Sequence, residues 1–383
     1  MTKGVRVHQE TICVHSGTYH DAATGGVNTP TFTSSSFEYL GRDEVVYPRH
    51  FNTPNQEAVV AKVCSLEGAE DGVLFSSGMA AMSSTVLAIA GAGDHVVMLD
   101  ELYGGTRAFA TDLCDRLGIK YSFAATDASA VAQAITPATK MIVIESPTNP
   151  LMGIIDIAHV ARIGKERGIV TVIDNTFATP VNQRPLGLGI DIVVHSGTKY
   201  MGGHSDLCCG AAVTSRQHAG TIRHAAKQLG GSVNAVTCSL LERSLKTLAI
   251  RIERQTENAS RIAAFLASHD AISRVNYPGL SQSSGHQIAR TQMTGFGAML
   301  SFELDGRRIT PASFLPRLKL VRPAVSFGGV ETLICSPAET SHASLSEEER
   351  RSVGITDALL RLSVGIEHVD DLLADLSGAL DGA

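Results

Sequence analysis

Short apolar runs alternate with segments of helical spacing between about residue 60 and residue 230. The apolar runs indicate strands that are buried on both faces, and they are residues 73–75, 95–99, 141–145, 170–174 and 191–195. The helical segments between them are residues 79–90, 108–117, 128–135 and 157–167. Because such alternation is typical of parallel sheets, this part of the chain predicts an open α/β sheet with helices on both faces.

The pattern changes on either side of this region. Residues 1–60 are polar, irregular and rich in Thr, Ser, Asn and Pro, and they predict an extended arm that packs against another part of the molecule or another subunit. Residues 231–268 have apolar residues at helical spacing and predict one long helix. Strands of a smaller domain are predicted at residues 272–277, 299–304 and 361–366. The predicted division is an arm (1–60), an α/β domain (61–250) and a C-terminal α+β domain (251–383).

Composition narrows the class of protein. The 383 residues suffice for two domains with separate cores. The formal net charge is −6 and no run of Lys or Arg occurs, which argues against a nucleic-acid partner. The most apolar stretch, residues 79–92, is interrupted by Ser83, Ser84 and Thr85, so no membrane span is predicted. The first residues show no apolar signal segment, and the seven cysteines form no CxxC pair, so we expect reduced thiols in the cytoplasm.

Polar residues follow several predicted strands, at the edge where open α/β sheets bind ligands. Residues 76–81 are a turn of small residues that opens a helix, where N–H groups can bind a phosphate. Glycine-rich turns of this kind also arise from close packing alone. Residues 145–150, Glu-Ser-Pro-Thr-Asn-Pro, leave Glu145 and Asn149 at the sheet edge, although a plain polar loop explains them equally well.

Two charged residues lie at or just past the ends of the next two predicted strands. Asp174 follows a buried strand and needs a partner, either a protonated heterocyclic nitrogen or the start of a helix. Lys199 either points to water, as most lysines do, or is desolvated and acts as a nucleophile. His195 and His204 have no cysteine or carboxylate at ligand spacing, so no metal site is predicted. The order of phosphate turn, polar loop, Asp and Lys is the order that pyridoxal-phosphate chemistry needs.

The segment around the lysine resembles a known family. Residues 191–206, Asp-Ile-Val-Val-His-Ser-Gly-Thr-Lys-Tyr-Met-Gly-Gly-His-Ser-Asp, are similar to the lysine signature of the cysteine/methionine metabolism family of pyridoxal-phosphate (PLP) enzymes. The resemblance extends from about Tyr47 to the C-terminus. It implies pyridoxal 5'-phosphate as cofactor and fold-type I (aspartate aminotransferase-like), with a mostly parallel central sheet and a smaller C-terminal α+β domain.

The resemblance also implies roles for individual residues. Lys199 would carry the cofactor and move protons, and Tyr103 would stack on the cofactor ring and take part in proton transfer. The other implied cofactor-binding residues are Gly78, Met79, Ser196 and Thr198 at the phosphate, Asp174 at the ring nitrogen, Asn149, and Tyr47 and Arg49, which reach the phosphate of a neighbouring subunit. Arg361 would bind the substrate carboxylate through its planar fork, with Asn149 and Ser326 helping to orient cofactor and substrate.

Three positions bear on the substrate. Val325 stands where many cystathionine γ-lyases and γ-synthases carry Glu, which weakens recognition of a distal charged amine and favours smaller thioethers. Gly105 stands where methionine γ-lyases often carry Cys, and this difference argues against a methionine γ-lyase. Residues 341–344, Ser-His-Ala-Ser, resemble plant-type cystathionine β-lyases.

The resemblance implies a C–S lyase that acts on small sulfur amino acids by γ- or β-elimination and releases a thiol, ammonia and a 2-oxo acid. The enzyme alternative is a γ-replacement transferase of the cystathionine γ-synthase type, acting on an O-acyl homoserine. The non-enzyme alternative is an inactive PLP-binding regulatory protein. A homo-oligomer, a dimer of dimers as in relatives, is expected, without nucleic-acid or membrane partners.

Overall fold

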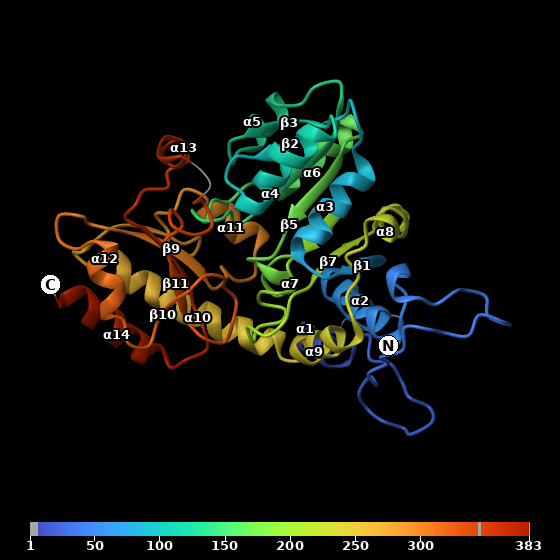
Figure 1. Cartoon of the computed structure of the whole chain (residues 1–383). Helices are drawn as coiled ribbons and strands as arrows, with labels where there is room; N and C mark the ends of the chain where they lie inside the picture. Colours follow the sequence, from blue (N-terminus) through green and yellow to red (C-terminus); the bar gives the residue numbers. More distant parts are fainter. Residues whose placement is uncertain (1–6, 344–345, 383) are drawn as a thin grey trace.

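The computed structural model describes residues 7–343 and 346–382, and its larger sheet has seven strands in the order β1-β7-β6-β5-β4-β2-β3 (Figure 1). The strands are β1 (Asp71–Phe75), β2 (His95–Leu99), β3 (Lys120–Ala124), β4 (Thr139–Glu145), β5 (Val170–Asp174), β6 (Ile192–His195) and β7 (Gly210–Thr214). Strand β7 is antiparallel to both neighbours, and the other pairs are parallel. The predicted mostly parallel sheet is confirmed.

Helices cover both faces of this sheet. Figure 1 shows β1 and β7 between α3 on one side and α2 on the other. The helices of this part are α1 (Gln9–His15), α2 (Pro54–Glu67), α3 (Gly78–Ile89), α4 (Gly104–Ala108), α5 (Ala128–Gln133), α6 (Ile157–Arg167), α7 (Thr179–Asn182), α8 (Arg216–Leu229), α9 (Ala235–Leu245) and α10 (Leu248–Ala267). Short 3-10 turns lie at Pro48–His50 and Pro185–Leu188. The helix predicted at residues 108–117 begins at α4 and continues as a π-helical segment, Phe109–Cys114.

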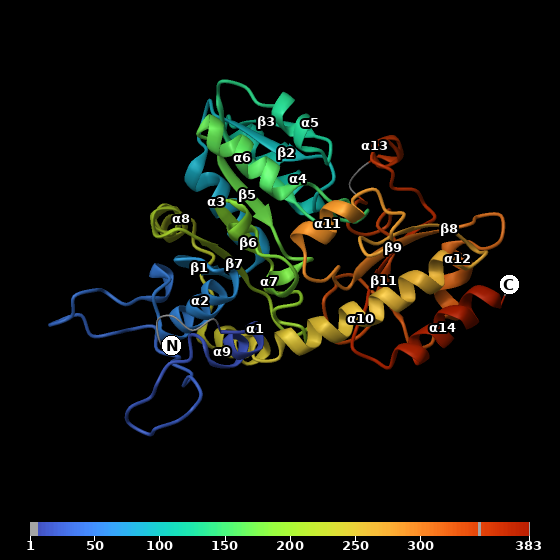
Figure 2. The same cartoon turned by 180° about the vertical axis from the view of Figure 1, so that it is seen from behind.

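The N-terminal region contains more helix than its polar composition indicates. Helix α2 begins inside it because Thr53 caps the helix, Gln56 bonds back to the Thr53 N–H in a capping box, and Pro54 occupies the first turn. Residues 16–47 form no helix or strand, and they reach out from the body as loops (Figure 2).

The single long helix predicted over residues 231–268 is wrong. The chain forms two helices there, α9 and α10, separated at Lys246 and Thr247. The buried guanidinium of Arg251 stabilises the break, because its Nη2 donates to the Ser244 carbonyl at 2.9 Å and its Nε donates to Thr247 Oγ1 at 3.2 Å. The Ser244 carbonyl, which lies at the end of α9, thus accepts a hydrogen bond from Arg251.

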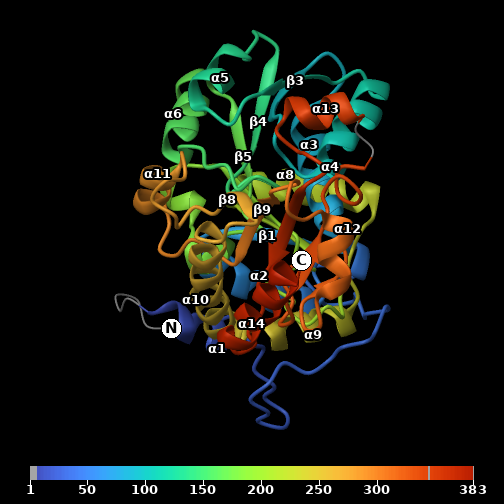
Figure 3. The ribbon, with the colours of Figure 1, turned by 90° about the vertical axis from the view of Figure 1, so that its left-hand side faces the viewer.

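A second, smaller sheet packs beyond α10, with five strands in the order β10-β11-β12-β9-β8 (Figure 3). Its strands are β8 (Ile272–Asn276), β9 (Met299–Leu304), β10 (Arg322–Pro323), β11 (Leu333–Cys335) and β12 (Leu359–Ser363). Its helices are α11 (His286–Gln292), α12 (Pro311–Phe314), a 3-10 turn at Leu315–Arg317, α13 (Glu347–Ser352) and α14 (Val369–Asp381). The predicted smaller α+β part is confirmed, with β12 beginning two residues before the predicted strand.

Helix α10 joins the two parts. Ile252 belongs to the core around the larger sheet, whereas Ala259 and Leu266 belong to the core around the smaller one. The change of core falls within α10, and the predicted boundaries at residues 60 and 250 stay predictions. Within the described ranges, no helix is both long and apolar enough to cross a membrane.

Candidate active site

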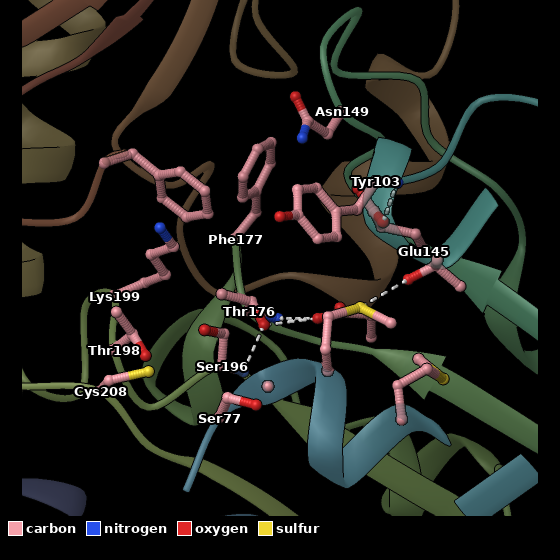
Figure 4. Close-up of a pocket in the computed structure, with 16 residues that line it drawn as sticks. Ser77, Tyr103, Glu145, Asn149, Thr176, Phe177, Ser196, Thr198, Lys199 and Cys208 are labelled. Atoms are coloured by element: carbon pink, nitrogen blue, oxygen red, sulfur yellow. Dashed lines mark hydrogen bonds between the residues drawn. The ribbon is translucent and has the colours of Figure 1, made fainter. Parts of the chain in front are cut away.

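A pocket of about 210 Å³ opens where the C-terminal ends of β1, β2, β4, β5 and β6 meet (Figure 4). This is the sheet edge at which open α/β folds bind ligands. The lining residues are Ser77, Gly78, Met79, Met82, Tyr103, Thr106, Glu145, Asn149, Asp174, Thr176, Phe177, Ser196, Thr198, Lys199, Cys208 and Phe327.

The start of α3 forms one wall. The Ser77 hydroxyl accepts from the Ala80 N–H at 3.0 Å, and the Ser77 carbonyl accepts from the Ala81 N–H. The N–H groups of Gly78 and Met79 have no acceptor within the described part of the chain, and the helix dipole adds positive potential there. A Cβ at Gly78 would lie 2.7 Å from the Ser196 Cβ, so only glycine allows this close approach. This wall suits a phosphate.

Asp174 ends β5 and lies beside Glu145, its register partner at the end of β4. Its Oδ1 accepts from the N–H and the hydroxyl of Thr176, which favours the ionised form. Burial outweighs these bonds and raises the Asp174 pKa above its ordinary value. A cationic partner inside the pocket would relieve this cost.

Glu145 connects the floor of the pocket to Tyr103. Its Oε2 accepts from the Tyr103 N–H at 3.0 Å. Burial, and then the nearby Asp174, hold the Glu145 pKa well above its ordinary range. The Tyr103 ring lies against Gly105, where a Cβ would come within 2.5 Å of a ring carbon. Any larger residue at position 105 would displace this ring.

Lys199 follows β6 and points into the pocket (Figure 4). Its Nζ donates to the Ser326 Oγ at 2.6 Å. Burial, together with the positive charge of Arg361, lowers the Lys199 pKa to about 8. The amine can therefore both hold and release a proton near neutral pH.

Arg361 lies on β12 and is buried at 4% exposure. Its Nη1 donates to the Asn149 Oδ1 at 2.9 Å, and its Nη2 donates to the Ser326 carbonyl at 3.2 Å. Within the described residues no carboxylate pairs with this guanidinium in an ion pair. An unpaired buried guanidinium beside a pocket is suited to bind a carboxylate ligand.

Most of the predicted site residues come together. Eight of them line the pocket, namely Gly78, Met79, Tyr103, Asn149, Asp174, Ser196, Thr198 and Lys199. Arg361 and Ser326 adjoin it through their bonds to Asn149 and Lys199. The Thr198 hydroxyl is already bonded to the backbone of Cys209.

The remaining predicted residues lie apart from the pocket wall. Val325 is 66% exposed. Tyr47 and Arg49 do not line the pocket, and Arg49 donates to the Lys227 carbonyl. Ser344 lies outside the described residues.

Several lining residues were not predicted, above all Thr176, Phe177, Cys208 and Phe327. Thr176 and Phe177 follow Asp174 directly, so their place after a ligand-binding strand end is a usable signal. Phe327 comes from a distant loop, and no local pattern indicates it.

His195 is accounted for without a metal. Its Nε2 lies 2.6 Å from the Glu67 Oε1, and both side chains are buried. His204 bonds the Gly202 carbonyl instead. No cluster of potential metal ligands occurs in residues 7–343 or 346–382.

Comparison with known proteins decides the family. The model of the "Cys/Met metabolism PLP-dependent enzyme" family matches residues 10–381. The chain belongs to this family. The predicted family, the fold-type I architecture and an enzyme of the trans-sulfuration class are thereby confirmed.

Relatives in the family carry different names. Cystathionine gamma-lyase of Bacillus subtilis (strain 168) is 43% identical over 97% of this chain and 99% of its own length. Cystathionine beta-lyase of Coxiella burnetii is also 43% identical, over 97% of this chain and 98% of its own. The crystal structure of cystathionine gamma synthase from Xanthomonas oryzae pv. oryzae in complex with cystathionine superposes with a TM-score of 0.95, at 37% identity and 98% coverage of both chains.

The pocket fits the cofactor of this family. The Gly78 wall is a cradle that a Cβ would fill, and the N–H groups of Gly78 and Met79 bond no acceptor in the part of the chain that the structure describes. Asp174 presents a largely enclosed carboxylate that forms no ion pair within residues 7–343 and 346–382, and Lys199 presents an amine. These donors and acceptors match the phosphate, the ring nitrogen and the aldehyde of PLP.

Proposed function

We propose that this chain binds PLP through Lys199 and is a carbon–sulfur lyase of sulfur amino acids. The observation that carries the proposal is the arrangement around Lys199: a partly buried amine with a lowered pKa lies in one pocket with Asp174, and Arg361 adjoins that pocket. The names of the relatives support the same class.

Each cofactor-binding residue would contact a different part of PLP. Gly78 and Met79 would hold the phosphate through their N–H groups, and the Ser196 hydroxyl would add a donor. Asp174 would accept from the ring nitrogen and keep it protonated. Tyr103 and Asn149 would fix the plane of the ring. The bound group supplies an electron sink for the bonding electrons at the substrate α-carbon.

Lys199 then acts as the general base and acid. With a pKa of about 8, the Nζ can take the α-proton of the substrate and pass it on. Its bond to the Ser326 Oγ orients the amine. Tyr103, at the pocket edge, would assist proton transfer to the leaving sulfur.

Arg361 would bind the substrate carboxylate bidentately, with Asn149 and Ser326 holding its guanidinium in place. Val325 presents an apolar, exposed side chain beside Ser326. It cannot pair with a distal ammonium group, which favours substrates with a small or apolar group beyond the sulfur.

A γ-replacement transferase is the second candidate. The observation in its favour is that the structure of a cystathionine gamma synthase superposes as well as that of a cystathionine gamma-lyase, with a TM-score of 0.95 for each. The lyase is preferred because Val325 offers no charge to bind the amino group of an incoming cysteine.

We propose further that the protein works as a homo-oligomer. Tyr47 and Arg49 lie outside the pocket of their own chain, and residues 16–47 expose apolar side chains such as Val27 and Leu40. Both facts fit an arm that completes the site of a neighbouring copy. The free thiols of all seven cysteines fit a reducing compartment such as the cytoplasm.

The experiment separates the reactions by product. Purified protein with PLP is incubated with L-cystathionine, with L-methionine, and with an O-acyl homoserine plus cysteine. We expect 2-oxobutyrate with ammonia (γ-elimination) or pyruvate with ammonia (β-elimination) from an unactivated thioether. Cystathionine formed only from the acylated substrate, with no 2-oxo acid from the thioethers, would exclude the lyase.

A further inference from the structure

Phe327 contacts both charged side chains of the proposed mechanism. Lys199 Nζ lies 4.6 Å from the centre of the Phe327 ring, and Arg361 Cζ lies 5.2 Å from the same centre. Both cations lie over the ring, within the distance at which an aromatic face attracts a cation. The ring is 9% exposed and lines the pocket, so water weakens this attraction little.

The ring is held by its other neighbours. Phe177 meets it edge-on, with ring centres 4.8 Å apart and an angle of 90° between the planes. Tyr200, the residue after Lys199, contacts it with ring centres 6.1 Å apart. These contacts fix the position of the Phe327 ring relative to the segment that carries Lys199.

The loop of Phe327 is fixed as closely as its ring. A Cβ at Gly328 would lie 2.6 Å from the Tyr200 N and 2.9 Å from the Lys199 carbonyl carbon, so the two segments touch backbone to backbone. The Gly328 N–H donates to the Ser363 hydroxyl at 2.8 Å, which ties the loop to β12. Phe327 is thus attached to the strand of Arg361 and to the turn of Lys199.

The chemistry explains why an aromatic residue suits this place. Arg361 and Lys199 repel each other when both are charged. A carboxylate between them would attract both, but it would also occupy the guanidinium that the substrate needs. An aromatic face attracts cations without a net charge, so it leaves Arg361 free for a carboxylate.

We propose that Phe327 is a positioning residue that holds the Lys199 amine and the Arg361 guanidinium on one aromatic ring, so that each keeps its place while the charge on the other changes. This inference rests on the proposed function, in which Lys199 moves protons and Arg361 binds the substrate carboxylate. The other titratable groups around Lys199 are Cys208, Asp174, Glu145 and Tyr103, and a substitution at residue 327 replaces none of them.

The test compares holoenzymes that differ at residue 327 in shape or in ring electrons. Phe327→Leu removes the ring, Phe327→Tyr keeps an electron-rich ring, and 3,4,5-trifluorophenylalanine keeps the shape but weakens the attraction for cations. Two properties are measured with L-alanine, which has no leaving group. The dissociation constant of L-alanine is measured from the change that it causes in the visible cofactor spectrum. The rate at which its α-proton exchanges in D₂O is measured by NMR as a function of pH.

The ring stabilises the protonated amine, so its loss lowers the pKa of Lys199. We expect the acid limb of the exchange profile to move to lower pH by about 0.4–1 unit in the leucine and trifluorophenylalanine proteins. L-alanine should bind about 2- to 5-fold more weakly to both, because Arg361 is held less firmly. The tyrosine protein should match the wild type in both readouts.

The result that would refute the positioning role differs from the result that would refute the proposed function. If the trifluorophenylalanine protein keeps the wild-type limb and affinity, the ring only fills space and the proposal is wrong. This protein decides the question even where Phe327→Leu fails to fold, because its shape is unchanged. If the wild type itself shows no visible cofactor band, the proposed function has failed; a normal band with no effect at residue 327 refutes the positioning role alone.

Discussion

Two carboxylates lie side by side at the floor of the pocket, and their surroundings give them different protonation. Asp174 accepts two hydrogen bonds from Thr176, which favour its ionised form. Glu145 is more deeply enclosed and lies beside Asp174, and both effects raise its pKa. We therefore infer that Asp174 is the carboxyl of this pair that more readily carries the negative charge.

Glu145→Gln tests this assignment through stability. A carboxyl whose pKa is higher in the folded than in the unfolded chain binds its proton more tightly when folded. Its contribution to the free energy of unfolding therefore falls as pH rises above the ordinary value of 4.5. We expect the free energy of unfolding of the glutamine variant to decrease less steeply with rising pH than that of the wild type. The Tm of the variant should match or exceed the wild-type Tm near pH 7. Thermal unfolding from pH 5 to 8 measures it, with the exposed Glu166→Gln as control; an unchanged pH slope would contradict the assignment.

Asp174→Asn tests the charge itself. The amide keeps the size of the side chain but cannot keep a ring nitrogen protonated. We expect the visible cofactor band to remain and kcat to fall by roughly 10²–10³-fold, the usual effect of removing one electrostatic contact in an active site. Steady-state kinetics on the preferred thioether measures it. A kcat within a few-fold of wild type would exclude the proposed pairing.

At this scale, the sequence predicts strand-end residues well and distant ones poorly. Asp174 and Lys199 are visible because each follows an apolar run. Arg361, without the family resemblance, looks like a surface charge, although it is buried between Asn149 and the loop of Ser326. Phe327 reaches the pocket only through folding of the whole chain, which no local pattern records.

At the scale of elements, Arg251 of α10 connects the helix break to the turn that carries Lys199. Its Nη1 donates to the Tyr200 carbonyl at 2.7 Å, and its Nη2 donates to the Ser244 carbonyl at 2.9 Å. Gly203 admits the guanidinium, since a Cβ there would lie 2.1 Å from it. One buried side chain thus shapes both the end of α9 and the position of the cofactor lysine.

Arg251→Met removes these bonds while keeping most of the side-chain length. We expect a loss of about 2–5 kcal/mol in the free energy of unfolding, because the Tyr200 carbonyl loses its donor and the Ser244 carbonyl loses one of its donors. PLP binding should weaken as well, because the turn that carries the lysine is held less firmly. Urea unfolding and PLP titration measure the two effects. Arg254→Met, on the exposed side of the same helix, should change neither. Equal behaviour of the two variants would refute this role.

The elements that the sequence does not predict were missed for one physical reason. Strand β7 begins with Gly-Ala-Ala, small residues with little preference for strands, and β3 lies at the sheet edge with Lys120 exposed. The break between α9 and α10 depends on the Arg251 side chain, which bonds the nearby Ser244 carbonyl and the distant Tyr200 carbonyl. Apolar periodicity records burial along one segment, and these features depend on contacts between segments.

At the scale of the whole molecule, the N-terminal loops leave apolar side chains in water. Val27 is 93% exposed and Leu40 is 80% exposed, both in the loops of residues 16–47 (Figure 2). The proposed assembly would give these side chains a surface to pack against. A neighbouring copy that receives Tyr47 and Arg49 at its pocket would cover them.

Subunit mixing tests this assembly. Lys199→Ala and Arg49→Ala proteins should each be nearly inactive, since one lacks the base and the other a proposed phosphate contact. If Arg49 serves the pocket of a neighbour, mixed oligomers contain some pockets with both residues intact. We expect activity to reappear after the two proteins are unfolded and refolded together, as measured by 2-oxo-acid release. No recovery, with mixed oligomers shown by mass spectrometry, would place Arg49 at the pocket of its own chain.

The most direct measurement of the central claim is the site of cofactor attachment. The protein is mixed with PLP, reduced with borohydride, digested and mapped by mass spectrometry. A pyridoxyl-phosphate group on Lys199, absent from the Lys199→Ala variant along with the visible absorbance band, is the predicted result. An unmodified Lys199, or a group fixed on another lysine of a protein that still turns over substrate, would contradict the account.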